Sequence, residues 1–188
     1  MTAEETRRVE EDLTYIRGAE ERMERGPYQS VTIAAIWAVI ITIGFSINDF
    51  RPEISMIYWP VASIGGYLIS LFIGKRSAVE AGECSPQETR AHAAHWGSVF
   101  MLCMAVLVIG FNHGWNGALF GQLFTLVSGA GCLLGGLHLD RRFLLPGVIL
   151  IVGAPAIDYI EPYPWTIVGL ATGVALMFSA LRMKSSDE

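Results

Sequence analysis

Long apolar stretches without charge alternate with short charged ones along the chain. Asp, Glu, Lys and Arg are all missing from five blocks, at 26–48, 54–74, 91–139, 143–157 and 162–181. A polar turn from Phe111 to Gly117 divides the third block, so that six apolar stretches result. Each is close to the roughly 20 residues that cross about 30 Å of hydrocarbon. The pattern predicts six transmembrane helices, of which 143–157 is the shortest.

The composition agrees with lipid rather than water as the surroundings of these stretches. Of 188 residues, 52% are hydrophobic and 16% are charged, whereas soluble domains carry about 25% charged residues. A soluble helix keeps one polar face, but "WAVIITIGF" and "MLCMAVLVIGF" are apolar all round. We therefore predict an all-α membrane protein. The first 25 residues are rich in charge, which is unlike a cleavable signal peptide.

The basic residues predict the orientation of the chain. Twelve of the thirteen Lys and Arg residues fall on one side of the predicted topology, and only Arg51 falls on the other. The twelve are Arg7, Arg8, Arg17, Arg22, Arg25, Lys75, Arg76, Arg90, Arg141, Arg142, Arg182 and Lys184. Because short cytoplasmic loops are enriched in Lys and Arg, we predict that both termini are cytoplasmic.

Three helical hairpins of one length are the second regular feature. The outward-going spans share a pattern near their ends, in which branched apolar residues are followed by a glycine and then a polar turn. The glycines are Gly44, Gly110 and Gly153, and 31 residues after each stands a basic residue: Lys75, Arg141 and Lys184. The hairpins would be 31–76, 96–142 and 143–184. A fixed period indicates a repeated unit, and a repeat would favour a compact bundle with pseudo-threefold character. The alternative is that any hairpin crossing one bilayer has a similar length.

Small residues mark helix faces in the returning spans. They are Gly65 and Gly66, Ser128, Gly131, Cys132, Gly135 and Gly136, and Gly169 and Gly173. In lipid, close backbone approach through small residues drives helix association. We read these faces as packing surfaces, within the chain or between copies of it.

Residues 1–26 are predicted to form a separate cytoplasmic amphipathic helix, and residues 185–188 a short tail. In 3–25 an apolar stripe of Val9, Leu13, Ile16 and Met23 runs along a charged helix. It would pack on the protein's own loops, pair with another chain or lie on the membrane. Its eight acidic residues against five basic ones disfavour the membrane, because anionic lipids attract basic clusters.

Histidines supply the clearest candidate for a site, at the cytoplasmic side. His92 and His95 are spaced i,i+3 at the start of span three, and His138 and Asp140 stand at the end of span four. Because these spans are neighbours in sequence, the four residues would converge and form a site for a divalent metal, the one cofactor the sequence suggests. Cys84 would be a fifth participant. The alternatives are solvated or hydrogen-bonded histidines, and pH sensing through their protonation.

Two further sets of polar residues are less clear candidates for a functional site. An acidic rim on the outer side, at Asp49, His113, Asp158 and Glu161, would attract cations or cap helix ends, and capping is favoured. Gln122, Thr125 and Ser128 in span four would line a pore if the bundle holds one. The spans contain no ionisable residue at mid-depth, which argues against a proton-coupled transporter.

The sequence lacks the patterns of catalysis and of nucleic-acid binding. It has no nucleophile with an adjacent base, no phosphate-binding loop and no basic, aromatic surface, so we expect no enzymatic activity. Cys103 and Cys132 lie within spans and Cys84 in a cytoplasmic loop, so that no structural disulfide is expected.

Three segments carry a resemblance: "DLTYIRGAEERMER", "HAAHWGSV" and "GGLHLDRRFLLPG". Together they resemble a group of uncharacterised short bacterial six-span integral membrane proteins. The resemblance implies a bacterial inner membrane and a six-helix topology, and it implies no activity and no catalytic residues.

The sequence as a whole favours a non-enzymatic inner-membrane protein that binds a partner or senses a state through its cytoplasmic parts. One alternative is a passive channel or carrier for a small neutral or cationic solute. A second is a metal-handling protein that uses the cytoplasmic histidines.

Overall fold

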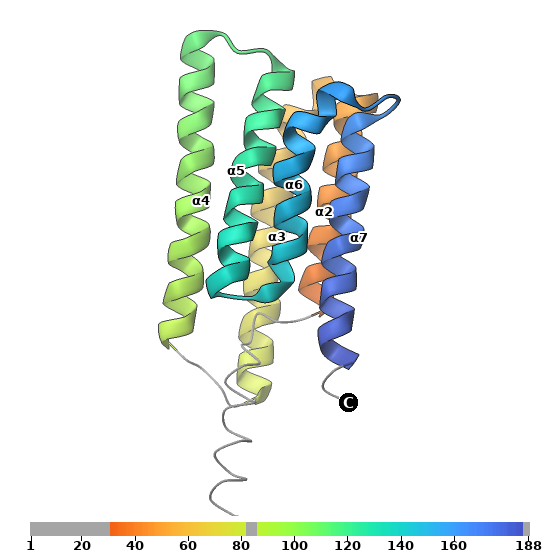
Figure 1. Ribbon diagram of the computed structural model, residues 1–188. Coiled ribbons are helices and arrows are strands. Elements are labelled where there is room, and N and C mark those ends of the chain that lie inside the picture. The colour runs from red at the N-terminus through yellow and green to blue at the C-terminus, as the bar shows by residue number, and fades with distance from the viewer. Residues whose placement is uncertain (1–30, 82–85, 186–188) are drawn as a thin grey trace, which may run out of the picture.

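The computed structural model describes residues 31–81 and 86–185, and all its regular elements are helical (Figure 1). The predicted helix at 1–26, Cys84 and the tail 186–188 lie outside the described residues. The elements are α2 (Val31–Phe50), α3 (Pro52–Ala81), α4 (Pro86–His113), α5 (Gly117–His138), the 3-10 turn η1 (Arg141–Phe143), α6 (Leu144–Ala156), the 3-10 turn η2 (Ile157–Tyr159) and α7 (Pro164–Ser185).

Six segments of the described chain are long and apolar enough to cross a membrane. They coincide with the six stretches that the missing charges predict, and they run up and down as antiparallel neighbours (Figure 1). The predicted all-α membrane fold is therefore confirmed for the described residues.

The fifth span is completed by 3-10 turns rather than by α-helix alone. The 13 residues of α6 rise only about 20 Å at 1.5 Å per residue. The turns η1 and η2 add three residues each, or roughly 12 Å together at about 2 Å per residue. The spanning segment Arg141–Tyr159 thus includes charged residues at both ends, which explains why the uncharged stretch is so short.

The helices pack in the order α4, α5, α6, α7, α2, α3, so that α3 and α4 are the two ends of a row of contacts. The row bends back on itself, because α2 and α3 lie behind α5, α6 and α7 in the view of Figure 1. The most extensive packing joins α2 to α7 and α5 to α6. A closed pseudo-threefold bundle would also pack α3 extensively on α4, and the described residues do not show this. Burial follows the same order, because 39% of the spanning windows of the α6 and α7 segments are buried but only 6% in α3 and in α4.

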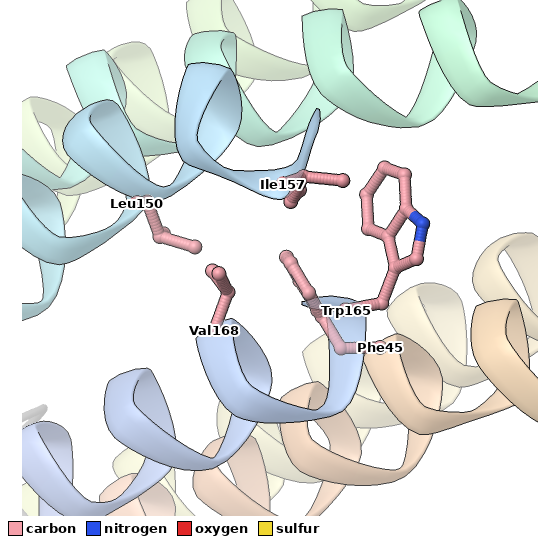
Figure 2. Close-up of a cluster of buried hydrophobic side chains, with 5 residues drawn as sticks. All are labelled: Phe45, Leu150, Ile157, Trp165 and Val168. Carbon is pink, nitrogen blue, oxygen red and sulfur yellow. The ribbon is translucent and has the colours of Figure 1, made fainter. Parts of the chain in front are cut away.

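The core lies between α2, α6 and α7. Its main cluster consists of Phe45, Leu150, Ile157, Trp165 and Val168, whose side chains meet between these elements (Figure 2). A second cluster nearer the other end of α2 and α7 contains mostly alanines, which allow the helices to approach closely: Ala34, Ala38, Leu176 and Ala180.

The predicted small-residue faces of α5 and α7 are packed within the chain. A Cβ on Gly129 would lie 2.8 Å from the backbone nitrogen of Ile151 in α6, and Gly169 and Gly173 leave no room for a Cβ against α2. These faces are therefore occupied and are not free for contacts between copies. On α3, Gly66 packs against Ile40, whereas Gly65 has nothing within 4 Å.

Hydroxyl groups within the spans bond to helix backbones. Thr125 donates to the Gly121 carbonyl at 2.7 Å and Thr172 to the Val168 carbonyl at 2.8 Å. Between helices, Tyr58 of α3 donates to the Ile40 carbonyl of α2 at 2.8 Å, and the Trp37 indole donates to Ser70 at 3.0 Å. In lipid such bonds hold helices together and satisfy polar groups that water cannot reach.

Candidate functional site

Charged residues divide the bundle into two ends. We call the end with Lys75, Arg76, Arg90, Arg141 and Arg182 the basic end, and the end with Asp49, Asp158 and Glu161 the acidic end. The candidate site lies at the basic end, where α4, α5 and η1 meet.

His95 of α4 is fixed against the backbone of α5. Its Nε2 lies 3.0 Å from the carbonyl oxygen of Gly131. Because a carbonyl oxygen only accepts hydrogen bonds, Nε2 carries the proton and donates it. Nδ1 is then the second ring nitrogen that can form a hydrogen bond. Gly135 makes this approach feasible, since a Cβ there would stand 3.0 Å from the same Nε2.

His138, at the end of α5, lies beside His95. The two imidazole rings are edge to face with centroids 5.0 Å apart. Trp96 contacts the His95 ring and also stacks edge to face on Phe143 of η1, at 5.3 Å. Four aromatic rings from three elements thus form one cluster, in which His95 is half-buried and His138 is exposed.

Asp140 organises the turn that follows α5. One carboxylate oxygen accepts a hydrogen bond from the Arg142 amide at 3.0 Å, and the other lies 3.6 Å from Nε of the same arginine. Both side chains are more than nine-tenths buried. The amides of Leu139 and Asp140 both donate to the Gly135 carbonyl. The turn is therefore fixed by buried polar contacts, while Arg141 points outward and is exposed.

The structure brings His95, His138 and Asp140 to the same end of the bundle but does not form the predicted four-ligand set. No three His, Cys, Asp or Glu residues within the described ranges have the arrangement that could hold a metal ion. His92 lies one turn before His95 on α4 and is half-buried. The Asp140 carboxylate is already bound to Arg142. A metal site that uses Cys84 as well stays a prediction, because Cys84 is not among the described residues.

At the acidic end, Asp49 is a cap rather than part of an open rim. Its Oδ2 accepts hydrogen bonds from the amide and the hydroxyl of Thr166, both at 2.7 Å. Thr166 is in the first turn of α7, where amides lack helical partners. His113, Asp158 and Glu161 are exposed at the same end, and their role in attracting cations stays a prediction.

The predicted pore residues lie on a helix that is packed on both sides. Thr125 is buried and stands one turn from Gly121, which packs against Trp165, and one turn from Gly129, which packs against α6. Gln122 and Ser128 are half-buried. The glycines on either side of Thr125 thus contact α7 and α6, and the role of Gln122, Thr125 and Ser128 in lining a pore stays a prediction.

Sequence reasoning missed Trp96, Phe143 and the Gly131 carbonyl as parts of this site. Trp96 follows His95 directly and Phe143 follows the arginine pair, so both were visible in the motifs "HAAHWG" and "LDRRF". Aromatic residues near span ends are common at the membrane interface, so neither position by itself indicates a contact between the two side chains.

Comparisons of the chain with protein-family models, with curated proteins and with solved structures gave no match. The class of the protein therefore follows from its own fold: it is a polytopic α-helical membrane protein, with six segments within residues 31–81 and 86–185 that are long and apolar enough to cross a membrane.

Proposed function

We propose that the protein is a non-enzymatic inner-membrane module that binds a protein partner with its cytoplasmic surface and acts through that partner. The basic end is the cytoplasmic surface in this proposal, since Lys and Arg are enriched in cytoplasmic loops. The bacterial inner membrane is the one implied by the resemblance described above.

One observation carries the proposal: the buried Asp140–Arg142 pair holds the α5–η1 turn in place and leaves Arg141 and His138 exposed beside it. A turn fixed in advance loses little conformational freedom on binding. It presents a guanidinium and an imidazole, which favour carboxylates or phosphates on the partner. The two alternatives have less support, because the described residues assemble no three-ligand metal group and Thr125 lies in a packed face.

Photo-crosslinking in living cells tests this proposal. A photoreactive amino acid is placed at Leu137 or Gln87, which are exposed at the basic end, and at Tyr159, which is 88% exposed at the acidic end. We expect discrete adducts heavier than the chain from Leu137 and Gln87, and none from Tyr159. The adduct at Leu137 should weaken in the Asp140→Ala variant, whose turn has lost its buried carboxylate, and should persist in the control Asp158→Ala.

Absence of adducts from both basic-end positions would contradict partner binding there. Equal adducts from Tyr159 would also contradict it, since they would show random contacts along the whole molecule. The same comparison in a chain without residues 1–26 shows whether that segment contributes to partner binding.

A further inference from the structure

His95 and His138 come from different helices and meet at the basic end of the bundle. His95 belongs to α4 and is half-buried, whereas His138 is the last residue of α5 and is exposed. Their ring centroids are 5.0 Å apart. Among the described elements, α4 packs extensively on α5 alone. The two histidines therefore lie where an end helix of the row is joined to the rest of the bundle.

The hydrogen bond of His95 prepares its other ring nitrogen for a ligand. Because Nε2 donates to the Gly131 carbonyl at 3.0 Å, the neutral ring has its free lone pair on Nδ1. Histidines that bind metals almost always donate their second ring N–H to a carbonyl or a carboxylate, which fixes the orientation of the ring. His95 thus has the backbone support that is typical of a metal ligand.

The separation of the two rings fits one metal ion between them. A metal about 2.1 Å from one nitrogen of each ring would stand about 3.2 Å from each ring centre, and a tetrahedral angle would place the two centres about 5.2 Å apart. The observed distance of 5.0 Å agrees with this value. Because His138 is exposed, its ring can rotate to turn a nitrogen toward the metal while α5 stays in place.

We propose that His95 and His138 together bind a divalent transition metal such as Zn²⁺, which links α4 to α5. Neutral imidazole suits Zn²⁺, Cu²⁺ and Ni²⁺, whereas Mg²⁺ and Ca²⁺ prefer oxygen ligands. The described residues hold no group of three or more His, Cys, Asp or Glu that could bind a metal, so the chain supplies two ligands and water fills the open positions. Asp140 is not a ligand, because its carboxylate is bound to Arg142.

Zinc binding by the purified full-length chain tests the proposal. Equilibrium dialysis against Zn²⁺ in detergent, followed by elemental analysis, compares the unchanged chain with single variants. We expect about one Zn²⁺ per chain, bound more weakly by at least about tenfold in His95→Ala and in His138→Ala. His92→Ala, Cys84→Ser and His113→Ala should bind Zn²⁺ as the unchanged chain does. His113 is the matched control, because it is a histidine exposed at the acidic end.

Thermal unfolding provides a second measurement. A ligand that binds only the folded state raises the unfolding midpoint, so Zn²⁺ should raise the midpoint of the unchanged chain and of His113→Ala. It should leave the midpoint of His138→Ala unchanged, and Mg²⁺ should raise none of the three. His138 is exposed, so this variant tests the site even if His95→Ala does not fold.

Three results would overturn the proposal. The first is that the unchanged chain binds no Zn²⁺. The second is equal binding in all the variants, which would mean that scattered carboxylates hold the ion. The third is loss of binding in His92→Ala or Cys84→Ser, which would place the ion in a larger set of ligands. These measurements use the purified chain alone, so their failure would leave partner binding at the basic end untouched. Absence of crosslinked adducts in cells would likewise leave the zinc site untouched.

Discussion

Asp49 joins two distant parts of the chain through one carboxylate oxygen. It stands at the end of α2 and accepts two hydrogen bonds from Thr166 at the start of α7, 117 residues away. The bond satisfies an amide that the first turn of α7 cannot pair, and the negative charge is favoured at a helix N-terminus. The Asp49 side chain therefore stabilises the packing of α2 on α7 at the acidic end of the bundle.

Replacement of this cap should lower the stability measurably. We expect Asp49→Ala to reduce the free energy of unfolding by about 1–2 kcal/mol, the usual cost of a lost cap. Asp49→Asn keeps an acceptor and should lose less, about 0.5 kcal/mol, from the lost charge. Unfolding in detergent micelles, followed by circular dichroism, measures both. Asp158→Ala, an exposed acid at the same end, is the control, and an equal loss there would refute the capping role.

Individual residues of the basic end show what the sequence can and cannot predict. His95 and His138 lie together as their position in neighbouring spans indicates. The hydrogen bond from His95 to Gly131 depends on how α4 and α5 are rotated about their axes, which two uniformly apolar helices do not reveal. The sequence predicts Asp140 as a metal ligand, whereas its hydrogen bond from the Arg142 amide and its ion pair with the Arg142 side chain depend on the 3-10 turn. A 3-10 turn inside a span leaves no signal in hydropathy.

Among the helices, α5 and α6 illustrate packing that leaves no space for side chains. A Cβ on Gly147 of α6 would stand 2.8 Å from the Leu133 Cα of α5 and 3.0 Å from the Cys132 carbonyl carbon. Because these are backbone atoms, they cannot move aside as a flexible side chain would. The positions of the spans were predictable from charge, although the length of the fifth was not, and this contact was predictable only as a tendency of small residues.

The stability of the contact between α5 and α6 should be sensitive to one added methyl group. We expect Gly147→Ala to lower the free energy of unfolding by about 2 kcal/mol, as overpacking does in tight cores. Gly97→Ala is the matched control, because Gly97 is also inside a helix but has nothing within 4 Å. It should be neutral or more stable by up to about 1 kcal/mol, from its better helix propensity. Thermal unfolding of the two purified variants measures the difference. Similar unfolding midpoints for the two variants would show that the α5–α6 contact accommodates the added methyl group.

For the molecule as a whole, apolar character does not tell which helices are central. The most hydropathic span is α2, yet the spans of α6 and α7 are more buried. Lipid tails and protein interiors are equally apolar, so hydropathy marks the span and not its neighbours. The six spans were therefore predictable, whereas the order of the row and its two exposed ends, α3 and α4, were not.

The direction of insertion is the property of the whole molecule on which partner binding depends. If the asymmetry of twelve basic residues to one reflects the positive-inside rule, the basic end faces the cytoplasm. A cysteine at Gln87, exposed at the basic end, should then react with a membrane-impermeant maleimide only after the cells are permeabilised. A cysteine at Tyr159, exposed at the acidic end, should react in intact cells. Both substitutions leave every basic residue unchanged, so they do not alter the signal under test. Labelling of Gln87→Cys in intact cells would reverse the orientation and would place the Asp140–Arg142 turn outside, away from any cytoplasmic partner.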